Sequence, residues 1–145
     1  MSLSTLLKRV QLFANLEDSE LGQLAAVCQE GTVGPGEFVI KQNTTGTEMY
    51  IIAEGAVEVF VQGLNDARTL VVLGQGQVIG EMALIDQGYR SASVRATRQG
   101  ATLYRINSDA FYALCAENNH IGYVVMRNLA TDLAFKLRHR NLAEL

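Results

Sequence analysis

Histidine, cysteine and positive charge are all scarce in this sequence. Its 145 residues include two His and two Cys, and 12 Lys and Arg stand against 15 Asp and Glu, which gives a net charge of −3. A surface with this balance has no general attraction for nucleic acid. Two isolated cysteines, Cys28 and Cys115, make no disulfide framework, so we expect buried thiols rather than a disulfide.

The shortage of histidine argues against a metal centre. His120 and His139 lie on one expected helix, outside the spacing of a metal cluster, and no expected strand carries the histidines of a cupin-like metalloenzyme. The glycine-rich run GQGQVIG lacks both the spacing and the following helix of a dinucleotide fingerprint, and no Walker-type sequence occurs. We therefore predict no metal site and no catalytic residue.

Long apolar runs are absent as well. No stretch of about 18 apolar residues occurs, so no membrane span is predicted. The first residues, MSLSTLLKRVQLF, are interrupted by Lys8, Arg9 and Gln11 and lack the core of a signal peptide. We expect a cytoplasmic protein that does not contact membranes.

A folded core is well supported, because 48% of the residues are hydrophobic. Residues 1–30 are predicted to be helical, with Leu21, Leu24 and Cys28 at helical spacing and Asp18 or Ser19 as the cap. Neither a repeat nor a linker is found. We therefore expect one domain over residues 1–145.

Residues 31–107 are predicted to form a β-barrel. Six short β-rich runs (EFVIKQ, EMYIIAE, AVEVFVQ, RTLVVLG, SASVRAT and ATLYRIN) are separated by turn sequences such as GPGE, NTTGT, EG, GLNDA, GQGQ and RQG. Across the Glu54–Gly55 turn, one face of the sheet is expected to carry Tyr50, Ile52, Val57 and Val59.

Residues 108–145 return to helical spacing. Ser108 is the expected cap of a first helix, and a long helix runs from about residue 119 to residue 142. This helix has two apolar stripes, one with Val125, Leu129, Leu133 and Leu137 and the other with Tyr123, Met126, Ala130 and Ala134. Either both stripes form one wide core face, or one stripe packs on the barrel and the other packs on a partner's helix.

The segment GEMALIDQGYRSASV, residues 80–94, places a carboxylate and a guanidinium in a run of apolar and small residues. Residues 81–85 suffice for one helical turn, whose first N–H groups lack partners and can hold an anion. Arg90 would complete a phosphate cradle. Glu81 would repel a phosphate, so it suits a sugar hydroxyl or holds Arg90; an ion pair that only ties down the loop is the alternative.

The same segment resembles the phosphate-binding cassette of cyclic nucleotide-binding domains. The match consists of Gly80, Glu81, Ala83, Leu84, Arg90, Ser91, Ala92, Ser93 and Val94, and the likeness continues upstream through LFANLEDSELGQLAA and GPGEFVIKQNTTGTEMYIIAEGAVEVF. Tyr89 departs from the proline that some kinase-type domains have before the arginine. The resemblance implies a mainly β fold with flanking helices, a double-stranded β-helix or jelly-roll barrel between N-terminal helices and a long C-terminal helix.

The resemblance also implies the site. By this resemblance Glu81 would accept from the ribose 2′-hydroxyl and Arg90 would pair with the cyclic phosphate. Backbone amides near Ala83, Ser91 and Ala92 would bind the same phosphate oxygens, with the Ser91 hydroxyl as a further donor. The expected ligand-binding set is Gly80, Glu81, Met82, Ala83, Arg90, Ser91 and Ala92. Residues of the last helix would cover the purine, and the counterpart residues are Asp132, Phe135, Lys136 and Arg138. The ligand is expected to be cAMP in preference to cGMP, with no further cofactor.

The chain is similar to the sensor half of Crp/Fnr-type regulators without their DNA-binding domain. We expect a regulatory module, not an enzyme, in which the ligand moves the last helix and thereby acts on an unknown effector protein or a second copy of the chain. No DNA binding by this chain alone is expected. The basic residues of the last helix, Arg127, Lys136, Arg138 and Arg140, are expected to form a solvated face; the alternative is a face on which an effector, a lipid or a DNA phosphate docks. The alternative is an interaction module of the same fold that binds no nucleotide.

Overall fold

The computed structural model describes residues 1–86 and 88–144, with side chains described as far as residue 139. The chain folds into two compact units. A barrel unit comprises Ala26–Phe111, and a helical unit comprises residues 1–25 together with those from 112 onward. None of the described helices combines the length and the apolar character that a membrane crossing requires.

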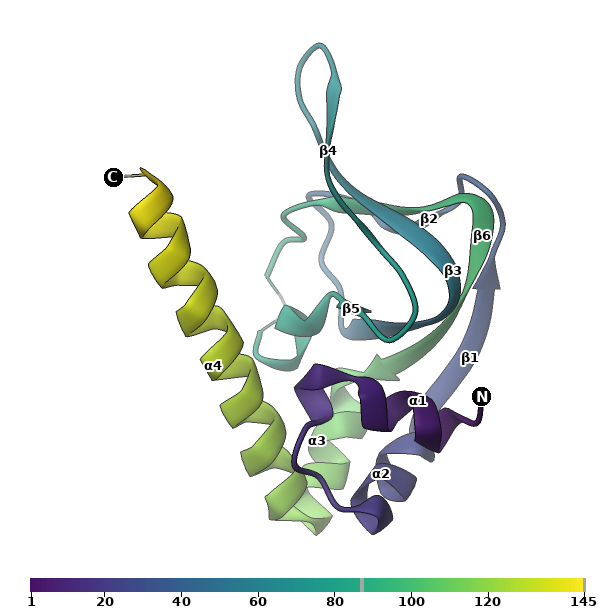
Figure 1. The fold of residues 1–145 in the computed structure, drawn as a ribbon, viewed down its shortest axis with the longest axis vertical. Coiled ribbons are helices and arrows are strands. Elements are labelled where there is room, and N and C mark those ends of the chain that lie inside the picture. Colours follow the sequence, from purple (N-terminus) through teal and green to yellow (C-terminus); the bar gives the residue numbers. More distant parts are fainter. Residues whose placement is uncertain (87, 145) are drawn as a thin grey trace. The chain divides into compact units, whose positions relative to one another are not determined.

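The barrel unit is built from antiparallel strands (Figure 1). They are β1 (Cys28–Val33), β2 (Phe38–Ile40), β3 (Glu48–Gln62), β4 (Ala67–Leu73), β5 (Val78–Ile79) and β6 (Ser93–Asn107). The main order is β1-β6-β3-β4, with β2 paired to β6 and β5 to β3. The long strands β3 and β6 pair along most of their length, so they form the frame to which the shorter strands attach.

Strands β3 and β6 are each continuous, whereas the sequence analysis predicted two shorter strands in place of each. At Gly55 and Gly100, where turns were predicted, φ is 77° and 67°, but the chain does not reverse. The register instead shifts between Ile52 and Glu54 and again between Gly55 and Val57, as in a β-bulge. Positive φ thus bends the two strands rather than ending them.

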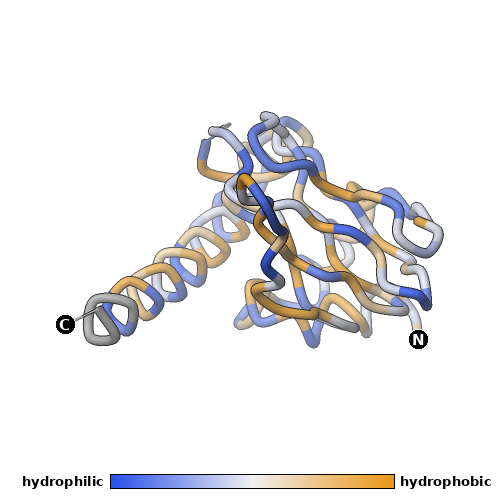
Figure 2. Tube along the Cα trace, turned by 90° about the horizontal axis from the view of Figure 1, so that it is seen from above, coloured by the Kyte–Doolittle hydropathy of each residue, from blue (hydrophilic) through white to orange (hydrophobic). Residues whose placement is uncertain are grey.

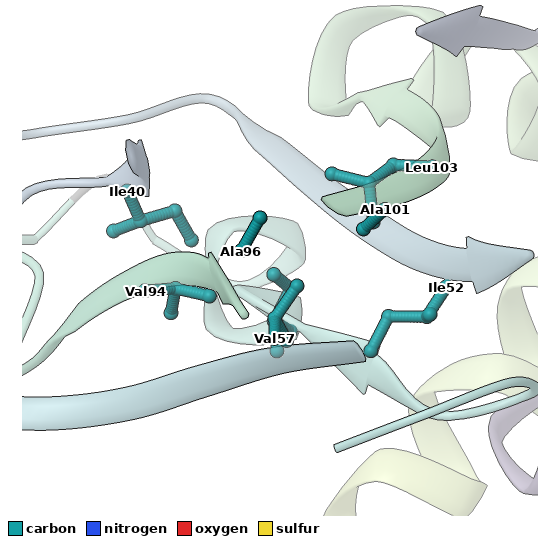
Figure 3. Close-up of a cluster of buried hydrophobic side chains, with 8 residues drawn as sticks. Ile40, Ile52, Val57, Val94, Ala96, Ala101 and Leu103 are labelled. Atoms are coloured by element: carbon teal, nitrogen blue, oxygen red, sulfur yellow. The ribbon is translucent and has the colours of Figure 1, made fainter. Parts of the chain in front are cut away.

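The barrel core lies on the inner faces of these strands. Its buried residues are Ile40, Ile52, Val57, Ile79, Val94, Ala96, Ala101 and Leu103, most of which are seen converging in Figure 3. Tyr50 and Val59 pack against them. The shared face predicted for Tyr50, Ile52, Val57 and Val59 is therefore confirmed, and the bulge explains how Ile52 and Val57, an odd number of residues apart, face the same side.

The helical unit contains α1 (Leu3–Arg9), η1 (Gln11–Phe13), α2 (Asp18–Ala25), the end of α3 (Ser108–Glu117) and α4 (Asn119–Glu144). Helix α1 is capped by the Ser2 hydroxyl, which accepts from the Thr5 N–H. Asn128 of α4 donates to the backbone oxygens of Leu12 and Ala14 at 2.9 and 2.8 Å. These hydrogen bonds tie the long helix to the N-terminal segment.

Three local predictions at helix ends were wrong. Cys28 starts strand β1 instead of extending a helix, so the barrel begins three residues before the predicted position 31. Helix α2 begins at Asp18, and the residue before it, Glu17, donates its N–H to the Glu20 carboxylate at 3.0 Å. The cap of α3 is Asn107, whose Oδ1 accepts from the Asp109 N–H at 2.9 Å, because Ser108 is already inside the helix.

The two cysteines are half-buried, less than expected. Burial raises the pKa of the Cys28 thiol to about 12 and also raises the pKa of the Cys115 thiol. Both side chains therefore stay protonated near neutral pH and are poor nucleophiles.

Helix α4 buries only its first turns. Val125 and Leu129 of the first predicted stripe are buried, but Leu137 is 60% exposed. In the second stripe Tyr123 is 62% exposed and Met126, Ala130 and Ala134 are not buried either. Figure 2 shows apolar and polar residues alternating round the helix. A single wide core face is therefore wrong for the described part of α4.

Candidate functional site

The predicted cassette follows β5 in the barrel unit. Gly80 takes φ 73°, in the left-handed region that glycine tolerates, and the chain then makes the 3-10 turn η2 (Glu81–Leu84). Ala83 and Leu84 are buried and anchor this turn, whereas Met82 is exposed. The single helical turn predicted after Gly80 is thus present.

Arg90 is held by backbone oxygens at both ends of its guanidinium. Nη2 donates to the Glu48 oxygen at 2.7 Å, and Nη1 lies 3.4 Å from the Gly80 oxygen. The Arg90 N–H donates to the Thr44 oxygen at 2.7 Å, and its own oxygen accepts from the Asn43 N–H at 2.9 Å. The half-buried arginine is therefore fixed by its main chain and its side chain, and no other described residue accepts from its remaining guanidinium N–H groups.

Glu81 does not hold Arg90. Within the described residues no ion pair joins their side chains, so the alternative in which this pair merely ties down a loop does not form. The Glu81 carboxylate is half-buried at the start of η2 and accepts no hydrogen bond from another described residue. Glu81 and Arg90 are thus two separate polar groups on the same cassette.

The backbone amides of the cassette fall into two groups. The Ala83 N–H donates to the Gly80 oxygen at 3.1 Å, inside the turn. No hydrogen bond within the described part of the chain occupies the N–H of Ser91 or Ala92, and the Ser91 side chain is exposed. These two amides and the Ser91 hydroxyl directly follow Arg90 in the sequence, and no described residue uses them as donors.

The end of the cassette is pinned to the 41–46 segment. Ser93 is buried, and its hydroxyl accepts from the Gln42 N–H at 2.9 Å. Thr45 and Tyr89 form an isolated antiparallel bridge. The residues that flank Ser91 and Ala92 are thus attached to the 41–46 segment by main-chain and side-chain contacts.

Sequence reasoning missed the partners of Arg90. It assigned the run NTTGT only to a turn, yet this segment supplies the Asn43, Thr44 and Gly46 neighbours, and Glu48 follows two residues after Gly46. The Glu48 oxygen is 42 residues before Arg90 in the chain. Nothing in a spacing pattern signals such a contact, because it is made by a backbone oxygen that every residue has.

The residues predicted to cover a purine lie on α4, in the helical unit. Lys136 pairs with Asp132 at 2.9 Å, one helical turn away. Phe135 is exposed and stacks on His139 with ring centroids 3.9 Å apart. Arg138 is exposed, and the Arg140 side chain lies outside the described residues. Their role over a ligand stays a prediction.

No group of three or more His, Cys, Asp or Glu side chains in the described residues is arranged to hold a metal ion. His120 instead contacts the buried carboxylate of Glu20, with Nδ1 2.8 Å from Oε2. The second histidine, His139, bonds to the Phe135 oxygen of its own helix. Both histidines therefore have partners within the helical unit.

Comparison with known proteins identifies the family. The model of the "Cyclic nucleotide-binding domain" matches residues 30–118, which include most of β1, all the later barrel strands and the whole cassette. The chain belongs to the cyclic nucleotide-binding domain family. The mainly β fold with helices before and after the barrel is thereby confirmed as that of the family.

Individual relatives include regulators of several kinds. The chain is 33% identical to the cyclic AMP receptor protein of Thermus thermophilus over 94% of its own length and 61% of that protein. It is 27% identical to the cGMP-dependent protein kinase egl-4 of Caenorhabditis briggsae over 77% of its own length, but only 15% of the kinase. The chain thus spans only part of each of these two relatives.

The solved N-terminal domain of a transcriptional regulator from Streptomyces coelicolor A3(2) superimposes with a TM-score of 0.83 and 26% identity. The alignment covers 97% of this chain and 95% of that domain. The similarity therefore includes the helices before and after the barrel as well as the strands.

Proposed function

We propose that this chain is a regulatory module that binds a cyclic nucleotide through its cassette, with cAMP preferred to cGMP. The observation that carries the proposal is the placement of Arg90. Its guanidinium is fixed by the Glu48 and Gly80 oxygens and still has unused donors, and the unused N–H groups of Ser91 and Ala92 follow it. A cyclic phosphate has two free oxygens that can accept hydrogen bonds at the same time, so it suits such a group of donors.

Each cassette residue has a role in this proposal. Arg90 binds the cyclic phosphate, and the Ser91 and Ala92 amides and the Ser91 hydroxyl bind the same phosphate oxygens. Glu81, which is not paired with Arg90, accepts from the ribose 2′-hydroxyl. Gly80, Met82 and Ala83 shape the turn beneath the sugar and phosphate.

The preference for cAMP rests on the share of this chain that each relative covers. The Thermus relative named as a cyclic AMP receptor matches 94% of the chain, and the relative named as a cGMP-dependent kinase matches 77%. The Ser91 hydroxyl suits either base, so it does not argue against cAMP.

Movement of α4 is the proposed output. The ligand shifts α4 between two positions, with Asp132, Phe135, Lys136 and Arg138 near the purine in one of them, and α4 acts on an effector protein or a second copy. The size of this shift is limited by the difference in the ligand's affinity for the two states.

Isothermal titration calorimetry tests the proposal. We expect wild-type protein, freed of co-purified nucleotide, to bind cAMP with micromolar affinity, cGMP more weakly and cyclic di-GMP not at all. Arg90→Ala should lower the affinity for cAMP by about 100-fold, since a charged hydrogen-bonded contact is lost. Arg98→Ala removes the same charge from an exposed position of β6 and should bind as wild type does.

If the folded wild type bound none of the three nucleotides, this proposal would be overturned and an interaction module of the same fold would be favoured. Equal affinity of Arg90→Ala and wild type would overturn the assignment of the phosphate to Arg90.

A further inference from the structure

Gly46 lies against the guanidinium of Arg90. A β-carbon built on Gly46 would stand 2.6 Å from Nε and 2.7 Å from Cζ, and closer still to Nη2. These separations are far inside van der Waals contact, so no other residue type fits while the guanidinium keeps its place. Gly46 therefore sets how near the barrel backbone the guanidinium can lie.

The backbone itself does not require glycine at this position. Positive φ is found at Gly36, Gly55, Gly76, Gly80 and Gly100 but not at Gly46. Alanine can therefore adopt the local conformation without backbone strain. What excludes a side chain at Gly46 is the arginine, which comes from a segment more than 40 residues later in the chain.

The hydrogen bonds of Arg90 explain why its position depends on this contact. Nη2, the atom nearest to the missing β-carbon, is also the atom that donates to the Glu48 oxygen at 2.7 Å. A methyl group at residue 46 would push Nη2 away and break that hydrogen bond. The guanidinium would then be free to take other rotamers, and its fork would no longer be preorganised for a two-point contact.

We propose that Gly46 is a positioning residue for phosphate binding, acting only through Arg90. This inference rests on the proposed function and adds a residue that does not touch the ligand. The clash is with the far end of a flexible side chain, so relieving it requires no movement of the backbone. The same substitution should therefore weaken ligand binding strongly and change folding stability little.

Gly34 provides a matched control in the same unit. A β-carbon on Gly34 would also meet the end of a flexible side chain, at 2.7 Å from Oε1 of Glu37, and Gly34 likewise lacks positive φ. A substitution at Gly80 would also displace Arg90, because its β-carbon would stand 2.6 Å from Nη1. It is unsuitable as a second test variant, since the φ of 73° at Gly80 would add backbone strain.

The experiment compares Gly46→Ala, Gly34→Ala and wild type by calorimetric titration with cAMP and by thermal unfolding. We expect Gly46→Ala to lose at least about 10-fold in affinity, as for loss of one charged hydrogen bond, and Gly34→Ala to bind as wild type does. Both variants should unfold within a few degrees of wild type. A Gly46→Ala protein that is unfolded at 25 °C would contradict the inference, since the backbone would then need the glycine.

A double-mutant cycle separates positioning from a general effect on the barrel. In the Arg90→Ala background, where nothing stands in the way of the methyl group, Gly46→Ala should cause no further loss of affinity. An equal loss in both backgrounds would show that Gly46 acts independently of Arg90 and would overturn the inference.

The outcomes also separate this inference from the proposed function. A folded wild type that does not bind cAMP or cGMP overturns the function and the inference with it. Binding that is weakened by Arg90→Ala but not by Gly46→Ala overturns the inference alone.

Discussion

Glu20 is a carboxylate buried in the helical unit, with only 4% of its surface exposed. It accepts from the Glu17 N–H at 3.0 Å and from Asn118 Nδ2 at 3.1 Å, and His120 Nδ1 lies 2.8 Å away. Burial acts to raise the pKa of Glu20, but the hydrogen bonds from Glu17, His120 and Asn118 and the charge of His120 outweigh it and lower that pKa. Glu20 therefore joins α2 to the start of α4 in its ionised form.

Glu20→Gln should lower the free energy of unfolding at pH 7 by about 2 kcal/mol, because an amide cannot accept from all of these donors. A lowered folded-state pKa contributes stability above the ordinary value of 4.5 and loses it as the pH falls through the folded-state value. The difference between variant and wild type should accordingly shrink below pH 4.5 in urea denaturation. Glu17→Gln, an exposed change of the same charge, should have little effect, and equal effects of the two would contradict this role of Glu20.

The bent, antiparallel strands β3 and β6 shape the barrel, and their backbones approach each other closely at Gly55 and Gly100. A β-carbon on Gly55 would stand 3.0 Å from the Ala101 Cα and closer still to the Gly100 oxygen, both of them backbone atoms of β6. Gly55 also has φ 77°. Unlike the clash at Gly46, this one cannot be relieved by turning a side chain.

Gly55→Ala should therefore destabilise the protein by at least about 2 kcal/mol, from the cost of positive φ together with the backbone clash. Chemical denaturation of the variant measures the loss. Gly31→Ala is the control, because its β-carbon would meet nothing within 4 Å on β1, and it should be neutral or slightly stabilising. A Gly55→Ala protein as stable as Gly31→Ala would show that the strands can separate at no cost.

The division of β3 and β6 into shorter strands shows what limits prediction at the level of elements. Glycine at residues 55 and 100 correctly indicated a positive φ, but that φ occurs both in reversing turns and in bulges. The neighbouring strand decides between them, and Gly55 pairs with Ala101, 46 residues later. The mistaken caps at Ser108 and Asp18 are smaller errors of the same local kind.

For the whole molecule, the C-terminal part of α4 is an exposed surface that can bind a partner. Tyr123, Phe135 and Leu137 are exposed on it, and no described residue from Ala130 to His139 is buried. Tyr123 and Leu137 belong to the two adjacent predicted stripes, whereas Phe135 lies on another side of the helix. An apolar helix face that remains exposed is typical of helix pairing between subunits. Homodimerisation through α4 thus remains our prediction, and the interaction of α4 with an effector is its alternative.

Sedimentation velocity at tens of micromolar should show a dimer, and Leu137→Glu should shift it to a monomer, since a carboxylate in an apolar helix seam is not solvated. Thr131→Glu adds the same charge at an exposed position off both stripes and should leave the dimer intact. A wild-type monomer at this concentration would remove dimerisation and leave α4 for another partner.

The sequence by itself determined the family and the cassette, because Gly80 to Val94 are neighbours in the chain and their residue types alone state the pattern. It also determined which residues of β3 face inward on either side of the bulge, since alternation holds within each half of the strand. Only the tertiary structure decided that β3 and β6 are continuous, that Glu81 does not pair with Arg90, and that Gly46 and the Glu48 oxygen fix the arginine. The continuity of the strands and the position of Arg90 depend on contacts between segments more than 40 residues apart, which the strand pairing of the folded barrel creates and local sequence does not encode.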